Sequence, residues 1–276
     1  MNYTISNDSL VVEISSLGAE LMSIKSKSDG TEYLWQGDKT YWGGRAYNLF
    51  PICGRLTDGK YTYGGNTYEM NLHGFLRKTE LVGCKIAENE VDFCLVANEK
   101  TLSVYPFNFE YHIMYILNGD SIDMDISVCN HDGKDLYFAL GGHPGFNVPL
   151  SNDKFEDYYI EFGEKCNLKS LSLSSTCYTL RNSVPFKLQA ENRLHMRHNL
   201  FDNDAIILED VCHTVTLKSN ACDKSVTLKT PEAMKYLGIW HAPKTEAPYV
   251  CMEPWTSVPA YDGEVDELTT KRDMMT

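Results

Sequence analysis

Short segments in which apolar and polar residues alternate recur along most of the chain. A period of two places apolar side chains on one face of a β-strand and polar side chains on the other. Turn signals such as "KSDG", "TDGK" and "LNGD" separate the segments, at the spacing of about 8–12 residues typical of a β-sandwich or barrel. The pattern predicts strands at residues 3–7, 9–15, 91–97, 109–117, 121–129, 157–162, 213–219 and 224–230.

Residues 61–70, "YTYGGNTYEM", predict a hairpin with Gly64 and Gly65 at its turn. Long amphipathic helical patterns are nearly absent, and the clearest short candidate is "KTYWGG" at Lys39–Gly44. Residues 170–199 are the least regular part, where we expect a loop-rich excursion over the sheets. Neither a linker nor a clear repeat divides the chain, so we expect one all-β, antiparallel domain over residues 1–276 with few short helices.

The composition limits the partners and the compartment. The 276 residues, 43% of them hydrophobic, are enough for one sizeable core. A formal net charge of -13 would repel nucleic acid and acidic membrane surfaces, so we expect neither as a partner. The chain shows neither a signal-peptide pattern nor an apolar run of bilayer length. Nine cysteines without a Cys-x-x-Cys pair indicate reduced thiols and a cytoplasmic protein.

Common cofactor and metal signatures are missing. The chain contains no Gly-x-Gly-x-x-Gly fingerprint, phosphate-binding loop or Gly-x-Ser-x-Gly nucleophile motif. His195 and His198 lie three residues apart near Asp202 and Asp204, but this spacing lacks a third ligand in a known arrangement. A polar surface loop is the better interpretation, and we expect no metal and no cofactor.

Four segments combine Gly or Pro with a polar side chain that is unusual for its surroundings. They are "NLFPICGRL" with Arg55, "NLHGFLRK" with His73 and Arg77, "LGGHPGF" with His143, and "CMEPW" with Glu253. In each segment the polar residue lies at or near the end of an apolar run. These segments are the candidates for chemistry.

His143 and Glu253 each precede a proline, Pro144 or Pro254. Proline holds its predecessor in extended geometry and cannot donate to the next ladder position, so both side chains should sit on stiff backbone where strand pairing stops. An X-Pro pair that merely ends a strand is the commoner case. The apolar setting of Glu253 favours either a raised pKa, suited to acid–base chemistry, or a salt bridge to a cation such as Arg55.

Aromatic residues offer a possible surface for a sugar. Trp255, Trp240 and the 17 tyrosines provide flat apolar faces with polar edges, which suit the C–H faces and hydroxyls of a monosaccharide. Aromatic side chains are also frequent in β cores, so this signal is weak without the other segments.

In this order, the segments resemble the aldose 1-epimerase (galactose mutarotase-like) family, most closely its bacterial LacX-type branch. The matching pieces span roughly residues 32–262, and "HGFLR", "GGHPGF" and "CMEPW" together are specific. The resemblance implies a large β-sandwich of the galactose mutarotase type, with a hexose in a cleft on one sheet face. It also implies exchange between α and β anomers without a cofactor.

The resemblance also implies roles for individual residues. Glu253 stands at the position of the family's general base, and His143 at that of its general acid. His73 matches a histidine that hydrogen-bonds near the ring oxygen, and Arg55 a substrate-binding arginine. Asp204 is placed on the aspartate that binds sugar hydroxyls, with Asp202 as the competing alignment.

Two alternatives remain open. The form "HGFLRK" is similar to that of hexose-6-phosphate mutarotases, whose extra basic groups meet a phosphate. Arg77 and Lys78 would have that role in this chain. In the alternative interpretation, both residues are the solvated end of a strand. A non-catalytic carbohydrate-binding or regulatory protein could use the same cleft, although a binder needs no paired acid and base. The expected partner in every case is a small sugar or sugar phosphate, bound by a monomer or homodimer.

Overall fold

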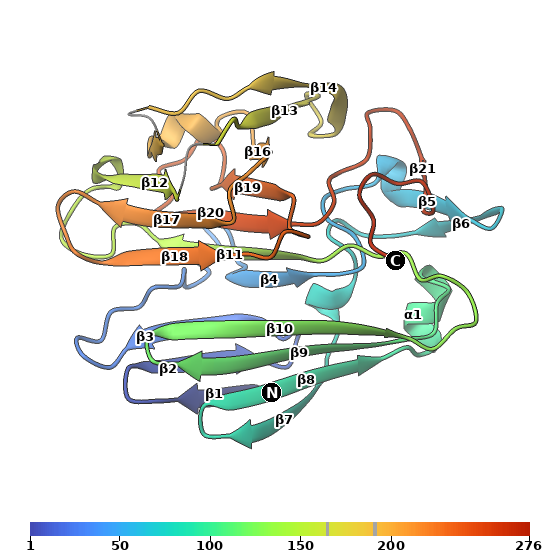
Figure 1. Cartoon of the computed structure of the whole chain (residues 1–276), viewed down its shortest axis with the longest axis horizontal. Coiled ribbons are helices and arrows are strands. Elements are labelled where there is room, and N and C mark those ends of the chain that lie inside the picture. The colour runs from blue at the N-terminus through green and yellow to red at the C-terminus, as the bar shows by residue number, and fades with distance from the viewer. Residues whose placement is uncertain (164–165, 190–191) are drawn as a thin grey trace.

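The alternating segments fold into β-sheets stacked in two layers (Figure 1). The computed structural model describes residues 1–163, 166–189 and 192–276. The lower layer in Figure 1 holds the sheets of order β1-β2-β3 and β10-β9-β8-β7. Their strands are β1 (Asn2–Ser6), β2 (Leu10–Ser15), β3 (Leu21–Ser26), β7 (Val82–Ala87), β8 (Glu90–Val96), β9 (Phe109–Asn118) and β10 (Ser121–Asn130).

The upper half of Figure 1 holds a seven-stranded sheet of order β14-β13-β16-β19-β20-β11-β4. Its strands are β4 (Ala46–Leu49), β11 (Gly141–Asn147), β13 (Lys169–Leu173), β14 (Thr179–Pro185), β16 (Ile206–Glu209), β19 (Tyr236–Trp240) and β20 (Tyr249–Trp255). A four-stranded sheet of order β15-β12-β17-β18 lies on the same side. Its strands are β12 (Tyr158–Phe162), β15 (Arg193–His195), β17 (Thr214–Ser219) and β18 (Ser225–Lys229).

A small sheet and short helices complete the described structure. The small sheet is β5 (Lys60–Tyr63), β6 (Asn66–Glu69) and β21 (Asp266–Glu267), in which β21 pairs parallel with β5. The α-helix is α1 (Glu99–Val104), and the 3₁₀ turns are η1 (Thr57–Gly59), η2 (Leu76–Lys78), η3 (Phe155–Asp157) and η4 (His198–Phe201). No helix in the described ranges is long and apolar enough to cross a membrane.

The periodicity of β9 shows why this sequence forms a layered fold. Every second side chain of the strand is buried, while its intervening residues, Glu110 and His112 among them, are partly exposed. β4 meets this inner face: the Asn48 side chain donates to the Tyr115 hydroxyl at 2.9 Å. Phe50, which follows β4, packs its ring 5.2 Å from Phe109. The two layers are therefore joined through a shared aromatic core.

The predicted antiparallel β-sandwich is confirmed. The eight predicted strands are present as β1, β2, β8, β9, β10, β12, β17 and β18. The hairpin at residues 61–70 is also present as β5 and β6, with Gly64 and Gly65 at φ 59° and 79°. Positive φ at both central residues is the geometry that favours glycine in a two-residue hairpin turn.

The helix predicted at Lys39–Gly44 is wrong. These residues form a turn, in which the amides of Tyr41 and Trp42 both donate to the Asp38 carbonyl, and the glycines that follow are not helical. The real helix, α1, begins after Asn98, whose side chain accepts from two amides of its first turn. Asn98 is an N-cap signal, which hydrophobic periodicity does not detect.

The stretch at residues 170–199 is more regular than expected. It contains β14 and most of β13, which pair with each other at one edge of the seven-stranded sheet. Their serine-rich and partly exposed sequence hides the alternation that identified other strands. Residues 190–191 of this stretch lie outside the described residues.

Candidate active site

The segments "GGHPGFN" and "YVCMEPW" form two neighbouring strands, β11 and β20. Their antiparallel register runs from Gly141 opposite Trp255 to Gly145 opposite Cys251. The same register places His143 opposite Glu253. Residues directly opposite in an antiparallel pair share one face of the sheet, so the imidazole and the carboxyl group emerge side by side.

The two prolines act differently from the prediction. Neither His143 nor Glu253 ends its strand, because β11 continues to Asn147 and β20 continues to Trp255. The paired positions of the β11–β20 ladder are interrupted between Gly141 and Gly145. Proline lacks an amide proton, and flanking pairs carry the strands past the gap.

His143 and Glu253 form a buried acid–base pair. The His143 Nε2 atom lies 3.3 Å from Glu253 Oε2, and the residues are 8% and 2% exposed. Burial lowers the pKa of His143 to about 3, and burial, with the nearby Asp204 charge, raises the pKa of Glu253 well above its usual value. Both shifts favour an uncharged pair that shares one proton.

The salt bridge considered between Glu253 and Arg55 is not formed. The Arg55 Nη2 atom instead lies 3.8 Å from Asp204 Oδ2, and its Nη1 donates to the Thr176 carbonyl at 3.0 Å. The Arg55 and Asp204 side chains are 38% and 27% exposed, so they stand at the mouth of the cavity above the buried pair.

His73 is held as a neutral hydrogen-bond donor. Its backbone has φ 63°, and its Nδ1 accepts from the Gly54 amide at 3.0 Å. Because Nδ1 is an acceptor, the ring proton of a neutral His73 must be on Nε2. Burial and the nearby His143 lower the pKa of His73 well below its usual value. The ring lies 5.5 Å from that of His143, at a nearly perpendicular angle.

Aromatic side chains enclose the imidazole of His143. Trp42 stacks on it at 4.7 Å and 26°, and Trp240 meets its ring edge-on at 5.6 Å. Tyr47, the neighbour of His143 in β4, closes another side at 6.2 Å. This packing explains the burial of the ring and limits its rotation. Trp42 and Tyr47 were not among the predicted site residues.

The glycines around His143 make room for these aromatics. A Cβ at Gly141 would lie 2.7 Å from Trp255 Cδ1. A Cβ at Gly145 would lie 3.1 Å from Trp42 Cζ3. The contact at Gly141 leaves no room for a Cβ, and a Cβ at Gly145 would require Trp42 to shift. Gly141 and Gly145 therefore serve the packing of tryptophans around the histidine.

One cavity of about 270 Å³ brings the predicted site residues together. Its volume is near the lower end of the range of roughly 300–1,000 Å³ for small-ligand pockets. Asp202, the competing candidate for the sugar-hydroxyl position, lies in a neighbouring hollow instead. Asp204 borders both hollows. The seven predicted residues that line the cavity are Arg55, His73, Arg77, His143, Asp204, Glu253 and Trp255.

The residues that line the cavity include both buried and accessible polar groups. Within the described part of the chain, His143 Nδ1 and Trp255 Nε1 are buried without a hydrogen-bond partner. Arg77 also lines the cavity, with its guanidinium 5.1 Å from the centre of the Tyr47 ring. A small ligand with several hydroxyls could therefore meet donors at the wall and an acid–base pair on the floor.

The neighbouring Cys251 thiol disfavours metal binding at the His143–Glu253 pair. His143, Cys251 and Glu253 offer ligand atoms within 4.8 Å of one another. Burial raises the pKa of the Cys251 thiol well above its usual value, which opposes formation of the thiolate that binds metals. His195 and His198 belong to neither of the groups that bring three ligand atoms this close in the described residues.

The comparisons with known proteins agree with these features. Residues 1–264 match the family model for aldose 1-epimerase. The chromosomal and plasmid forms of protein LacX from Lactococcus lactis subsp. lactis are each 34% identical over 268 residues, or 94% of this chain and 88% of theirs.

Solved structures give the same result for the fold. A galactose mutarotase-like protein from Lactobacillus casei has a TM-score of 0.93 at 31% identity, covering 100% of this chain and 94% of its own. A galactose mutarotase related enzyme from Lactobacillus acidophilus has a TM-score of 0.91 at 33% identity, covering 100% and 92%. The resemblance inferred from the motifs and the predicted fold type are confirmed.

Proposed function

The chain belongs to the aldose 1-epimerase family of carbohydrate epimerases, and on this premise we propose that its cavity interconverts the α and β anomers of a free hexose. The observation that carries the proposal is the buried pair of His143 and Glu253 on the neighbouring strands β11 and β20. The His143 Nε2 and Glu253 Oε2 atoms of this pair are 3.3 Å apart. Mutarotation needs one group that removes the anomeric hydroxyl proton and one that protonates the ring oxygen.

In the proposed ring opening, Glu253 is the base and His143 is the acid. The shared proton first passes from Glu253 to His143, which leaves a carboxylate and an imidazolium. The carboxylate then takes the proton from the O1 hydroxyl as the C1–O5 bond breaks, and the imidazolium gives its proton to O5. The product is an open-chain aldehyde beside a protonated Glu253 and a neutral His143. Rotation about C1–C2 presents the other carbonyl face, and the two transfers run backward to close the ring.

Burial of the pair helps this reaction. Ring opening converts a charged imidazolium and carboxylate into two neutral groups, the state that the pKa shifts of His143 and Glu253 favour. The low-polarity floor therefore favours the two proton transfers once the imidazolium and the carboxylate have formed. Each proton-transfer group contributes typically about 10²–10⁴-fold to the rate.

The other cavity residues hold the sugar. We propose that His73 donates from Nε2 toward the ring oxygen, because its Nδ1 is occupied by the Gly54 amide. Arg55 and Asp204, which face each other at the mouth, would bind hydroxyls. Trp255, which lines the cavity, would offer a flat apolar face. We place the protein in the cytoplasm, since its cysteines form no disulfide within the described ranges.

The direct test is anomer exchange measured by NMR or polarimetry on free and phosphorylated hexoses. Faster exchange than in protein-free buffer on a free hexose would support the proposal. Exchange at the buffer rate on every sugar, together with saturable sugar binding, would support the non-catalytic carbohydrate-binding alternative and contradict it.

A hexose-6-phosphate is the second candidate substrate, because the Arg77 guanidinium lines the cavity. If it binds phosphate, Arg77→Ala should lower kcat/KM for a hexose phosphate relative to a free hexose by about 10-fold or more, as expected for a lost charged hydrogen bond. Equal effects on both sugars would exclude a phosphate contact. Lys78→Ala is the matched control, since this exposed neighbour does not line the cavity.

A further inference from the structure

A second group of chemically active side chains lies on the outer face of the β10-β9-β8-β7 sheet. Cys94 on β8 is the register partner of His112 on β9. Both point away from the core, because their neighbours along the strands, such as Phe93 and Tyr111, are fully buried. None of these residues lines the cavity that contains His143.

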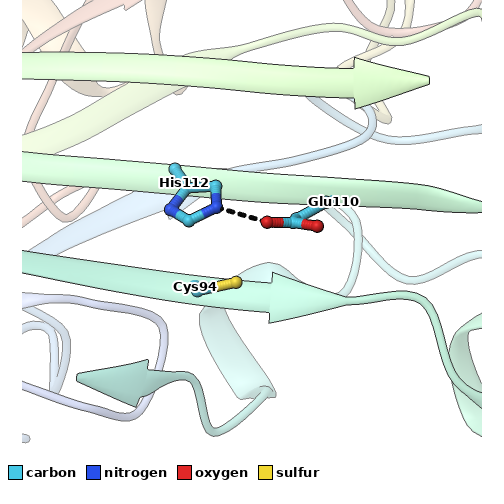
Figure 2. Close-up of side chains that lie close together, drawn as sticks. All are labelled: Cys94, Glu110 and His112. Atoms are coloured by element: carbon cyan, nitrogen blue, oxygen red, sulfur yellow. Dashed lines mark hydrogen bonds and ion pairs between the residues drawn. The ribbon is translucent and has the colours of Figure 1, made fainter. Parts of the chain in front are cut away.

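Three different ligand types converge there. The Cys94 sulfur, a Glu110 carboxylate oxygen and a His112 ring nitrogen all lie within 4.8 Å of one another. Figure 2 shows the thiol of β8 beside the imidazole and carboxylate of β9, with the sulfur turned toward the side of Glu110. His112 Nε2 lies 2.7 Å from Glu110 Oε1. The His112 and Glu110 side chains are 31% and 34% exposed, so an ion could reach them from solvent.

Asp92 orients the imidazole from its other side. The His112 Nδ1 atom lies 2.9 Å from Asp92 Oδ2. An Nδ1–H that donates to a carboxylate leaves Nε2 as the ligating nitrogen, an arrangement common behind metal-bound histidines. His131 Nε2 lies 3.3 Å from the other Glu110 oxygen, Oε2, and helps to hold this carboxylate in place, but it does not belong to the converging group.

The protonation of the ligating side chains determines what a cation must displace. Hydrogen bonds to Glu110 and Asp92 raise the pKa of His112, so a proton on Nε2 holds the ring between two carboxylates. Burial and these carboxylates raise the pKa of the Cys94 thiol, which opposes thiolate formation as it does at Cys251. Cys94 is only partly buried, however, so a cation can reach it from solvent and its proton can leave. A divalent cation would displace the Nε2 proton and the thiol proton, and both would leave to solvent.

We propose that Cys94, Glu110 and His112 form a site for Zn²⁺ or a similar borderline divalent cation, with water as the fourth ligand. A thiolate, an imidazole and a carboxylate match the preferences of Zn²⁺ and Co²⁺, whereas Mg²⁺ and Ca²⁺ prefer oxygen ligands alone. The site joins β8 to β9 on a face separate from the sugar cavity.

Co²⁺ titration of the full chain tests the site directly, because thiolate coordination produces a near-ultraviolet charge-transfer band. We expect saturable binding of one Co²⁺ per chain, with the band displaced by Zn²⁺. Cys94→Ser and Cys94→Ala should both lose the band. Cys84→Ser and Cys129→Ser are matched controls that should retain it, because both cysteines are exposed on neighbouring strands and outside the converging group.

Asp92→Asn separates the orienting role from ligation. This variant should keep the charge-transfer band but weaken Co²⁺ binding by about 10–100-fold, measured by competition with a chelating dye. A missing band in the unmodified chain would overturn the proposal. So would a band that survives both Cys94 substitutions, or one lost in either control, since the metal would then lie elsewhere.

Discussion

At the scale of single residues, what surrounds His143 decides how it can handle a proton. Its ring is stacked on Trp42, faces the edge of Trp240 and contacts Glu253 across the strands. Removal from water disfavours the imidazolium, while the carboxylate 3.3 Å away is the acceptor that can stabilise it during the reaction. The same environment predicts the effect of a substitution and of pH.

Replacing His143 with Asn should remove the proton-transfer group while keeping a planar polar side chain of similar size. Enzymatic anomer exchange should fall by about 100-fold or more, the contribution of one general acid. Polarimetry after subtraction of the buffer rate measures the effect, and circular dichroism checks the fold. His195→Asn, at a partly exposed ring outside the cavity, is the control and should keep full activity. Unchanged exchange in the His143 variant would contradict the assignment.

The pH profile should reflect a pair that shares one proton. A second proton inactivates the pair only on acidification toward the pKa of His143, which burial lowers to about 3. Loss of the shared proton inactivates it as pH rises through the raised pKa of Glu253. We therefore expect kcat/KM to be constant from about pH 5 upward until the pH approaches the raised pKa of Glu253. A midpoint of acid inactivation near 6.5, the ordinary histidine value, would show that the ring is not desolvated.

The sequence predicted the cavity residues but not all of their partners. Arg55, His73, Arg77, His143 and Glu253 were found because each polar group interrupts an apolar, Gly- or Pro-containing segment. Their roles stay predictions. Trp42 and Tyr47 carry no such signal, because an aromatic residue is equally expected in a β core. Their positions beside His143 depend on a turn and a strand pairing that periodicity does not determine.

At the scale of elements, the register between β11 and β20 places His143 opposite Glu253. The prolines led us to expect strand ends, but the local sequence could not show that these two strands pair with each other. Their partners lie more than a hundred residues apart in the chain. Alternation identifies strands, whereas the pairing of distant strands depends on the whole fold.

Gly141→Ala tests whether the β11 glycines are needed for aromatic packing. The new Cβ would lie 2.7 Å from Trp255 Cδ1 and 2.9 Å from Cys53 Sγ. We expect a loss of about 1–3 kcal/mol in the free energy of unfolding, as for other overpacked cores, measured by urea denaturation.

Gly142→Ala is the matched control for this element. Its Cβ would have no neighbour closer than 3.6 Å, so stability should change little. If both variants were as stable as the unmodified chain, packing against Trp255 would not explain the glycine at position 141. If both variants were destabilised to the same extent, the backbone flexibility of glycine in the strand would be the cause instead.

At the scale of the whole molecule, the layers are joined by aromatic packing around Phe50. This fully buried ring lies 5.8 Å from Tyr105, 5.2 Å from Phe109 and 5.1 Å from Tyr111. It follows a strand of the seven-stranded sheet and contacts the lower layer, so the sugar cavity and the proposed metal site belong to sheets that share one core.

Phe50→Ala should destabilise both layers together. We expect a loss of about 3–5 kcal/mol in the free energy of unfolding, as is typical for a buried Phe→Ala change. Val82→Ala, at a residue 76% exposed, should change stability by less than about 0.5 kcal/mol. A single urea transition that shifts as a whole would support the predicted single domain, residues 1–276. Two separate transitions, only one of them shifted, would contradict it.

The place of β20 between β19 and β11 has a consequence for biosynthesis. β11 leaves the ribosome about a hundred residues before β20, so the nascent chain carries β11 with one edge unpaired until residues 249–255 follow. Such an edge can pair with another chain, which makes this interval the one in which the growing polypeptide most needs protection. The His143–Glu253 pair likewise cannot form until translation has passed Glu253, because His143 is synthesised long before its partner.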